Sequence, residues 1–201
     1  MQFIDMFPTP LMVSTEMTLR DEVLPIAEEY IYSHGKPFSN NENYISTYGI
    51  NSASFAQSND TRLNGLTNTI TNYAHEYFET HCIDSKQNWN FSVYYLFNRM
   101  TGGGEHSLHS HPWSMLSGCF YLKVPNGAPP IIFQDPRDYH KFIHYPIRFG
   151  ETREKYKLLS EYVIHPTDGM LLMWPSWLEH QVPKSQVDDE RIVVAFNIET
   201  K

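Results

Sequence analysis

The C-terminal part of the chain reads as a series of short strands, and this pattern constrains the fold more than any other feature. Runs rich in β-branched and aromatic residues lie at 89–98, 115–124, 130–134, 161–165, 169–174, 178–183 and 190–198. Pro, Gly and Asn separate the runs, which is typical of antiparallel sandwiches and barrels rather than of βαβ units. The pattern predicts a jelly roll of about seven strands.

Two helices are expected before the strands. Apolar side chains recur at helical spacing over residues 18–32 and again over residues 60–80. Thr18 is a suitable N-cap for the first helix, and the sequence from Gly35 to Pro37 ends it. Shorter strands are expected within residues 1–15 and near residues 44–48.

Together these patterns predict a single domain over residues 1–201 that is mainly β with flanking helices. Residues 1–85 form a helical buttress, and residues 86–201 form the β core. We expect the two N-terminal helices to pack on one sheet of the jelly roll, because an amphipathic helix must bury its apolar face.

Residues 136–160 stand apart from the strand pattern. Aromatic and charged residues alternate there without a clean period. A connection of this length inside one domain is usually functional, so we expect a lid over a substrate. The alternative is a surface excursion with a short helix near residues 151–159.

Composition narrows the functional classes. The formal net charge of −8 disfavours nucleic-acid binding, which needs a basic surface. Two cysteines, Cys82 and Cys119, are too few for a disulfide framework and are expected to be buried, reduced thiols. No signal-peptide pattern or membrane-length apolar run occurs, so we expect a cytoplasmic protein without a membrane partner. A homodimer is compatible with the sequence.

Three histidines form a candidate metal site. His109 and His111 are two residues apart, so an extended strand would project both from one face. His180, from a distant strand-like segment, could supply a third ligand. The glycines at 102–104 mark a tight turn just before the pair. Neutral imidazole suits iron, zinc, copper and nickel, so ligand type alone does not identify the metal.

Arg191 is a candidate anion-binding residue. It alternates with Val193, Ala195 and Asn197 on one face of the last strand, opposite a fully apolar face. Arginine binds carboxylates in a bidentate manner, and Tyr121 could donate its hydroxyl to the same carboxylate. The alternatives are a hydrogen-bonded core tyrosine and a surface ion pair of Arg191 with Asp188, Asp189 or Glu190.

Several sequence blocks resemble one enzyme family. They are HSHPWSMLSGCFYL, IIFQDPR, GMLLMWPSWLEHQV and RIVVAFN, together with FPTPL near the N-terminus. In combination they resemble the 2-oxoglutarate/Fe(II)-dependent oxygenases found in bacteria and tailed phages. The resemblance touches both ends of the chain, although residues 15–85 contribute little to it.

The resemblance implies a double-stranded β-helix core, a facial triad that binds Fe(II), and 2-oxoglutarate and O2 as co-substrates. His109 would be the first metal ligand and His180 the distal one. Arg191 would pair with the far carboxylate of 2-oxoglutarate, assisted by Tyr121. Asn197 falls on the matching asparagine and is expected at the co-substrate site. The reaction would be hydroxylation of a peptide, a prolyl group or a small molecule, in a bacterial or phage-infected cytoplasm.

The chain departs from the wider superfamily at one ligand. The usual first motif is H-x-D or H-x-E, whereas His111 occupies the carboxylate position here. Three neutral histidines would leave an Fe(II) site with a charge of +2 instead of +1. Asp135 is a substitute carboxylate, although it lies far away in sequence.

Two other functions stay open at this point. Gly103, followed after five residues by His109 and His111, is similar to the first cupin motif, and cupins bind metals with three histidines. The cupin motif then needs a glutamate where Met115 and Leu116 stand. The alternatives are therefore a cupin-like dioxygenase or isomerase that does not use 2-oxoglutarate, and a non-enzymatic jelly-roll binding protein.

Overall fold

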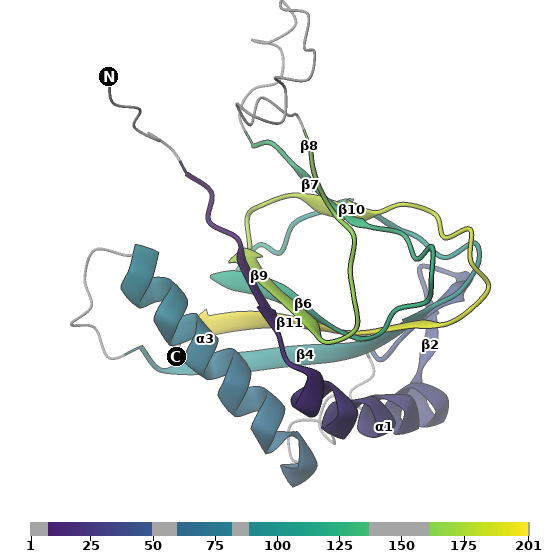
Figure 1. Ribbon diagram of the computed structural model, residues 1–201, viewed down its shortest axis with the longest axis horizontal. Helices are drawn as coiled ribbons and strands as arrows, with labels where there is room; N and C mark the ends of the chain where they lie inside the picture. The colour runs from purple at the N-terminus through teal and green to yellow at the C-terminus, as the bar shows by residue number, and fades with distance from the viewer. Residues whose placement is uncertain (1–7, 50–59, 82–88, 137–160, 201) are drawn as a thin grey trace, which may run out of the picture.

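Two antiparallel sheets form the core of the protein (Figure 1). The computed structural model describes residues 8–49, 60–81, 89–136 and 161–200. The larger sheet has the order β1-β9-β6-β11-β4-β3-β2, and the smaller sheet has the order β5-β10-β7-β8. The strands of the larger sheet are β1 (Met12–Thr15), β2 (Lys36–Phe38), β3 (Asn41–Ser46), β4 (Phe91–Met100), β6 (Leu116–Lys123), β9 (Met170–Pro175) and β11 (Arg191–Thr200). Those of the smaller sheet are β5 (His106–His109), β7 (Ile131–Gln134), β8 (Glu161–Ile164) and β10 (His180–Val182).

Two α-helices cover the outer face of the larger sheet. They are α1 (Met17–His34) and α3 (Asn64–His81), which follows the short 3-10 helix η1 (Thr61–Leu63). Their apolar stripes form one cluster with the outward-facing side chains of β11, namely Ile192, Val194, Phe196 and Ile198. Each such side chain contributes roughly 1.5–3 kcal/mol when it is removed from water. The predicted packing of both helices on one sheet is therefore confirmed (Figure 1).

The start of α1 differs from the prediction. The helix begins at Met17 with Glu16 at the cap position, so the expected N-cap at Thr18 is wrong. The Glu16 carboxylate makes no capping bond and instead accepts hydrogen bonds from the hydroxyls of Ser14 and Tyr73. The backbone N–H of Glu16 donates to the carbonyl of Gly169 at 2.8 Å. Contacts with distant segments therefore set this helix end.

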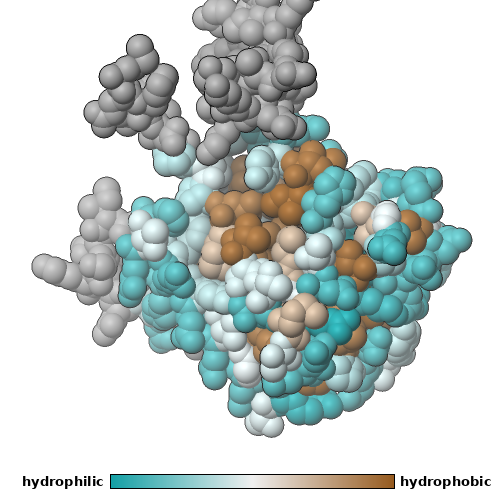
Figure 2. Space-filling view, in the orientation of Figure 1, coloured by the Kyte–Doolittle hydropathy of each residue, from teal (hydrophilic) through white to brown (hydrophobic). Residues whose placement is uncertain are grey.

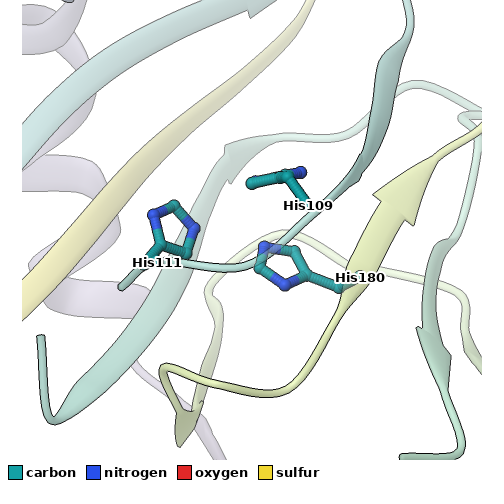
Figure 3. Close-up of side chains that lie close together, drawn as sticks. All are labelled: His109, His111 and His180. Carbon is teal, nitrogen blue, oxygen red and sulfur yellow. The ribbon is translucent and has the colours of Figure 1, made fainter. Parts of the chain in front are cut away.

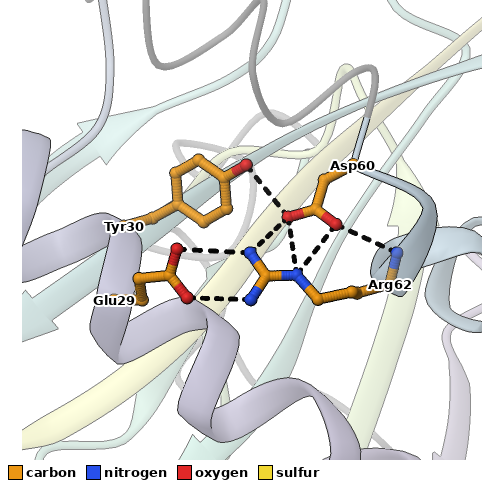
Figure 4. A network of polar contacts seen from close by, with 4 residues as sticks. All are labelled: Glu29, Tyr30, Asp60 and Arg62. Carbon is orange, nitrogen blue, oxygen red and sulfur yellow. Dashed lines mark hydrogen bonds and ion pairs between the residues drawn. The ribbon is translucent and has the colours of Figure 1, made fainter.

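A polar network joins α1 to the start of the second helical segment (Figure 4). The guanidinium of Arg62 lies 2.8 Å from the Glu29 carboxylate and 2.6 Å from that of Asp60. Tyr30 donates its hydroxyl to Asp60 at 3.1 Å. The Arg62 side chain is the main cause of the low pKa of Asp60, which falls from 3.8 to about 2. Asp60 therefore stays ionised in the folded protein at ordinary pH.

The inner face of the larger sheet faces the smaller one. Strand alternation turns Arg191, Val193, Ala195 and Asn197 toward the interior, as the sequence predicts, and all four line a cavity. The sheet register places Val193 between Asn98 of β4 and Tyr121 of β6. The inner face therefore carries a band of polar groups among small apolar ones.

The smaller sheet shows the main differences from the expected strands. The strand expected at residues 178–183 is shorter than predicted and consists of β10 alone. A turn precedes it, in which the N–H of Leu178 donates to the carbonyl of Pro175 at 2.9 Å. The strand expected to carry His109 and His111 is β5, which ends at His109, and β2 of the larger sheet was not expected. No described helix covers the outer side of the smaller sheet (Figure 1). Tyr162 and Val163 of β8 are exposed there. Figure 2 shows a patch of hydrophobic residues on the face of the molecule that is turned to the viewer.

The remaining sequence predictions concern the lid, the two cysteines and the absence of a membrane span. The lid expected at residues 136–160 lies outside the described residues except for Pro136, and Cys82 also lies outside them. Cys119 is buried and free of a disulfide, as expected, and burial raises its pKa to about 12. Neither described α-helix is apolar enough over its length to span a lipid bilayer.

Candidate active site

The side chains of three histidines lie close together in a cavity (Figure 3). His109 ends β5 and His180 begins β10, and the two face each other as cross-strand partners. Their ring centroids are 4.3 Å apart, and the His111 ring lies 4.9 Å from His109 and 5.2 Å from His180. One nitrogen of each ring lies within 4.8 Å of the other two. In the described part of the chain, this is the one group of three such residues that could hold a metal ion.

Local structure brings the histidines together in a way that the sequence predicts in part. Gly103 has a φ of 90°, and a Cβ at Gly104 would lie 2.5 Å from the backbone oxygen of Asn43, so the glycine turn permits a close backbone approach. The strand ends at His109, so His111 is not on the same strand as predicted. It lies in the following connection, where its N–H bonds the carbonyl of Ser176 at 2.9 Å.

Hydrogen bonds orient two of the three rings. Nδ1 of His109 is 2.7 Å from the carbonyl oxygen of Ser107, and Nδ1 of His180 is 3.0 Å from that of Leu178. A carbonyl oxygen can only accept, so Nδ1 carries the proton in both rings and Nε2 keeps a free lone pair. Backbone carbonyls orient metal-ligating histidines in the same way in known sites.

Burial keeps the histidine cluster uncharged. Burial lowers the pKa of all three histidines. The pKa of His111 falls to about 4 and that of His180 to about 3, and in these two the neighbouring imidazoles lower the pKa further. Neutral imidazole is the form that binds a metal. The donor set therefore fits a transition metal such as Fe(II).

No carboxylate joins this cluster within the described residues. Asp135 follows β7 and is partly exposed, but it does not belong to the group of potential ligands. Among the described residues, the potential ligands at this place are therefore three histidines.

Arg191 lies inside the protein near the histidines. It is only 6% exposed, and its guanidinium carbon lies 5.1 Å from the ring centroid of Tyr121. Arg191 Nε and the Tyr121 hydroxyl are buried without a hydrogen-bond partner among the described residues. Burial also raises the pKa of Tyr121, so its hydroxyl keeps its proton. Among the described residues, both groups are therefore available as donors to a ligand in the cavity.

The alternative expectation for Arg191, a surface ion pair, is wrong. Glu190 bonds instead to Arg99 at 3.2 Å and to Lys123 at 3.3 Å, on the opposite face of the sheet. Arg191 makes one long contact, from Nη1 to the sulfur of Met100 at 3.9 Å. A buried guanidinium without a carboxylate fits a site that receives an anion from outside.

Asn197 has a structural connection that the sequence did not reveal. Ser117 donates to Oδ1 of Asn197 at 2.7 Å, so the hydroxyl of Ser176, also at 2.7 Å, must donate to Ser117. The backbone carbonyl of Ser176 accepts a hydrogen bond from the backbone N–H of His111. This buried chain of hydrogen bonds links the inner face of β11 to the connection that carries His111.

A cavity of about 260 Å³ connects these groups. The three histidines, Arg191, Tyr121 and Asn197 all line it. Sequence reasoning missed further polar lining residues, among them Asn98 of β4 and His106 of β5. The His106 ring stacks on His109 with centroids 4.0 Å apart.

Comparisons with known proteins agree with this geometry. Residues 95–197, slightly more than half of the chain, match the family model of 2OG-Fe(II) oxygenases. No curated protein matches the sequence. Several solved structures of 2-oxoglutarate-dependent enzymes share the fold.

The structural neighbours are distant in sequence. A Pseudomonas putida prolyl-4-hydroxylase has a TM-score of 0.63 at 11% identity, covering 96% of this chain and 94% of its own. HygX from Streptomyces hygroscopicus, solved with nickel, 2-oxoglutarate and hygromycin B, has a TM-score of 0.58 at 12% identity, covering 95% and 83%. A Trichoplax adhaerens prolyl hydroxylase, solved with a hypoxia-inducible factor peptide fragment, has a TM-score of 0.53 at 12% identity, covering 94% and 83%.

These likenesses establish a double-stranded β-helix fold, which confirms the expected architecture. The family is one of enzymes that use Fe(II) with 2-oxoglutarate and O2 as co-substrates. The family match, over residues 95–197, covers all three histidines and Arg191. The chain belongs to the 2OG-Fe(II) oxygenase family.

Proposed function

We propose that this protein is a 2-oxoglutarate-dependent hydroxylase in which His109, His111 and His180 hold Fe(II). One observation carries the proposal. Three neutral, converging imidazoles share a single cavity with an unpaired, buried guanidinium and an unpaired, buried hydroxyl. The imidazoles suit a divalent cation, and the donors of Arg191 and Tyr121 suit a carboxylate.

Each residue has a defined task in this proposal. Arg191 binds the far carboxylate of 2-oxoglutarate, and the neutral Tyr121 hydroxyl donates to the same group. Asn197 holds Ser117 and, through Ser176, fixes the backbone of His111. The walls of the cavity exclude bulk water from the reacting atoms.

Bound iron with 2-oxoglutarate supplies the activation of O2, so that a C–H bond of the substrate becomes C–OH while 2-oxoglutarate yields succinate and CO2. The substrate is a peptide, such as a prolyl peptide, or a small molecule. The solved relatives include enzymes of both kinds, a prolyl hydroxylase with a peptide and HygX with hygromycin B. A cytoplasmic location and a homodimer remain predictions.

An anaerobic titration of Fe(II)-loaded protein with 2-oxoglutarate tests the proposal. Chelation of the metal by 2-oxoglutarate gives a weak visible charge-transfer band, which we expect in the wild type. We expect weaker binding in Arg191→Ala and loss of stoichiometric iron in His180→Ala. His81→Ala is the matched control, because His81 is an exposed residue at the end of α3.

The outcomes separate the remaining alternatives. Bound iron without the band would favour a cupin-like enzyme that does not use 2-oxoglutarate. The absence of bound iron in the wild type would favour a non-enzymatic jelly-roll protein with a binding or structural role. Either result would contradict the proposal.

A further inference from the structure

The cavity has a second wall that the proposed cofactor and co-substrate leave free. It is formed by Phe38, Tyr44 and Tyr48 of the β2–β3 region and by His106 of β5, which we call the aromatic wall. The ring of Phe38 contacts the other three, with centroid distances of 5.2 Å to Tyr44, 5.7 Å to Tyr48 and 5.2 Å to His106. Tyr48 is 63% exposed, so this wall reaches from the interior to the surface.

Asn98 is the polar group beside the aromatic wall. Its side chain is 7% exposed and lines the cavity, yet it has no hydrogen bond to any residue that the structure describes. The register places Asn98 directly across from Ser46 on β3 and from Val193 on β11. The carboxamide of Asn98 is not among the fully buried polar atoms, so its donors and its acceptor face the cavity and are available to a ligand that replaces water there.

The charge of the cavity limits what can enter. Arg191 is the one residue with a formal charge among the lining residues in the described chain, and the proposed function assigns it to 2-oxoglutarate. The rest of the lining offers amides, hydroxyls, neutral imidazoles and apolar groups. The proposed function also uses the metal and Arg191 for the two carboxylates of 2-oxoglutarate. A charged substrate group placed against the rest of the lining would therefore lose its hydration without meeting a side chain of opposite charge, at a cost of several kcal/mol.

Size limits the ligand as well. Small-molecule sites usually have volumes of ~300–1,000 Å³. The cavity here measures about 260 Å³ and must also hold 2-oxoglutarate under the proposed function. Only a small part of the substrate, such as one side chain or ring, can enter beside the co-substrate.

We infer that Asn98 and the aromatic wall form the substrate subsite, and that it takes a small, uncharged group with an amide or carbonyl for Asn98 to bond. This inference rests on the proposed function and specifies its substrate. The rings of the aromatic wall pack against the apolar part of that group, and the Asn98 carboxamide fixes its orientation. Asn98 is thereby a specificity-determining residue.

Three proline derivatives of different charge test the inference. They are N-acetyl-L-prolinamide, which is uncharged, N-acetyl-L-proline, which is anionic, and L-prolinamide, which is cationic. Each is titrated into protein loaded with Ni(II) and 2-oxoglutarate, which does not turn over. Paramagnetic broadening of the NMR lines of the probe gives its affinity, without any activity readout.

We expect the uncharged probe to bind about tenfold more tightly than either charged probe, because a buried unpaired charge is unfavourable. Asn98→Ala should weaken its binding about fivefold through the loss of a hydrogen bond. The affinity for 2-oxoglutarate should stay within about twofold of the wild type, since Arg191 is untouched. Asn98→Asp is the matched variant of nearly equal shape, and it should shift the preference to the cationic probe.

Several results would overturn the inference. A charged probe that binds the wild type as tightly as the uncharged one would do so, as would no binding of any probe. Loss of 2-oxoglutarate affinity in Asn98→Ala would instead place Asn98 at the co-substrate. Failure of the wild-type protein to bind 2-oxoglutarate at all would refute the proposed function, and this inference with it, so the two failures are distinguishable.

Discussion

Replacement of Arg191 by methionine should have opposite effects on stability and on ligand binding. The guanidinium is 6% exposed, meets no carboxylate among the described residues and packs against the ring of Tyr121. Its removal should stabilise the ligand-free protein by about 1–2 kcal/mol, because an unpaired buried charge disappears while the ring contact is partly lost. For a chain of this size, that corresponds to a rise in Tm of roughly 2–8 °C.

Binding of 2-oxoglutarate should fall in the same Arg191→Met variant. Truncation of one partner of a buried charge pair costs about 2–5 kcal/mol, so the affinity should drop by about 30-fold or more. Thermal melts of the Ni(II)-loaded protein, with and without 2-oxoglutarate, measure both effects. A ligand at 100 times its Kd stabilises the wild type by about 2.7 kcal/mol, and a variant that binds about 30-fold more weakly should gain only about 0.9 kcal/mol at the same concentration, or less if the loss of affinity is larger.

Two comparisons make the Arg191→Met experiment decisive. Arg191→Lys keeps the charge but loses the planar fork, so it should gain no stability and bind 2-oxoglutarate with intermediate affinity. Arg99→Met removes an arginine from the opposite face of the sheet, where it bonds Glu190, and should leave the 2-oxoglutarate affinity unchanged. A less stable Arg191→Met protein that still gains wild-type stabilisation from 2-oxoglutarate would refute the reasoning.

Three further predictions concern stability. The pKa of Asp60 is lowered from 3.8 to about 2, so its carboxylate stabilises the fold above pH 4, and this contribution is lost as the pH falls toward 2. With solvent screening it amounts to about 1 kcal/mol, so urea melts of Asp60→Asn should differ from the wild type by that amount at pH 6 and by almost nothing at pH 2. Ser117→Ala leaves the hydrogen-bonding groups of Asn197 and Ser176 without their partner, so it should lower the free energy of unfolding by about 1–3 kcal/mol. Calorimetry should also show weaker Ni(II) binding by this variant. Unchanged stability would contradict a role of this hydrogen-bond network. Trp113 is 94% exposed with a φ of 83°, so Trp113→Gly should raise the free energy of unfolding in urea by about 0.5–1 kcal/mol, whereas Trp113→Ala should not.

Strand alternation made the core of the fold predictable. The last strand, β11, has a fully apolar face and a mixed face in the sequence, and the structure buries the first under the helices and turns the second into the cavity. A period of two residues depends only on the local backbone, so one sequence is enough to detect it. The same logic placed His109 and Arg191 on inward-facing positions.

Features that depend on distant partners could not be predicted in this way. The start of α1 follows from bonds of Glu16 to Tyr73 and Gly169, neither of which is near in sequence. Ser117 meets Asn197 across 80 positions, and no local motif marks that pair. Asn98 looks like an ordinary strand residue until the cavity beside it is known. Which residues meet in this way depends on contacts between distant segments, such as the register of the sheet, and these contacts cannot be deduced from one sequence.

The unfavourable features of the ligand-free chain have one common explanation. Three imidazoles, of which that of His180 is buried and the other two are half-buried, crowd together at one place on the cavity, and a guanidinium without a carboxylate partner among the described residues lies at another. Neither arrangement stabilises the chain by itself, and local departures from good packing of this kind are expected at functional sites. A cation held by the imidazoles would turn the first arrangement into a favourable one. A dicarboxylate that reaches from that cation to Arg191 would then satisfy the second with the same molecule. The chain thus has a reason to keep both only if it binds the two ligands together.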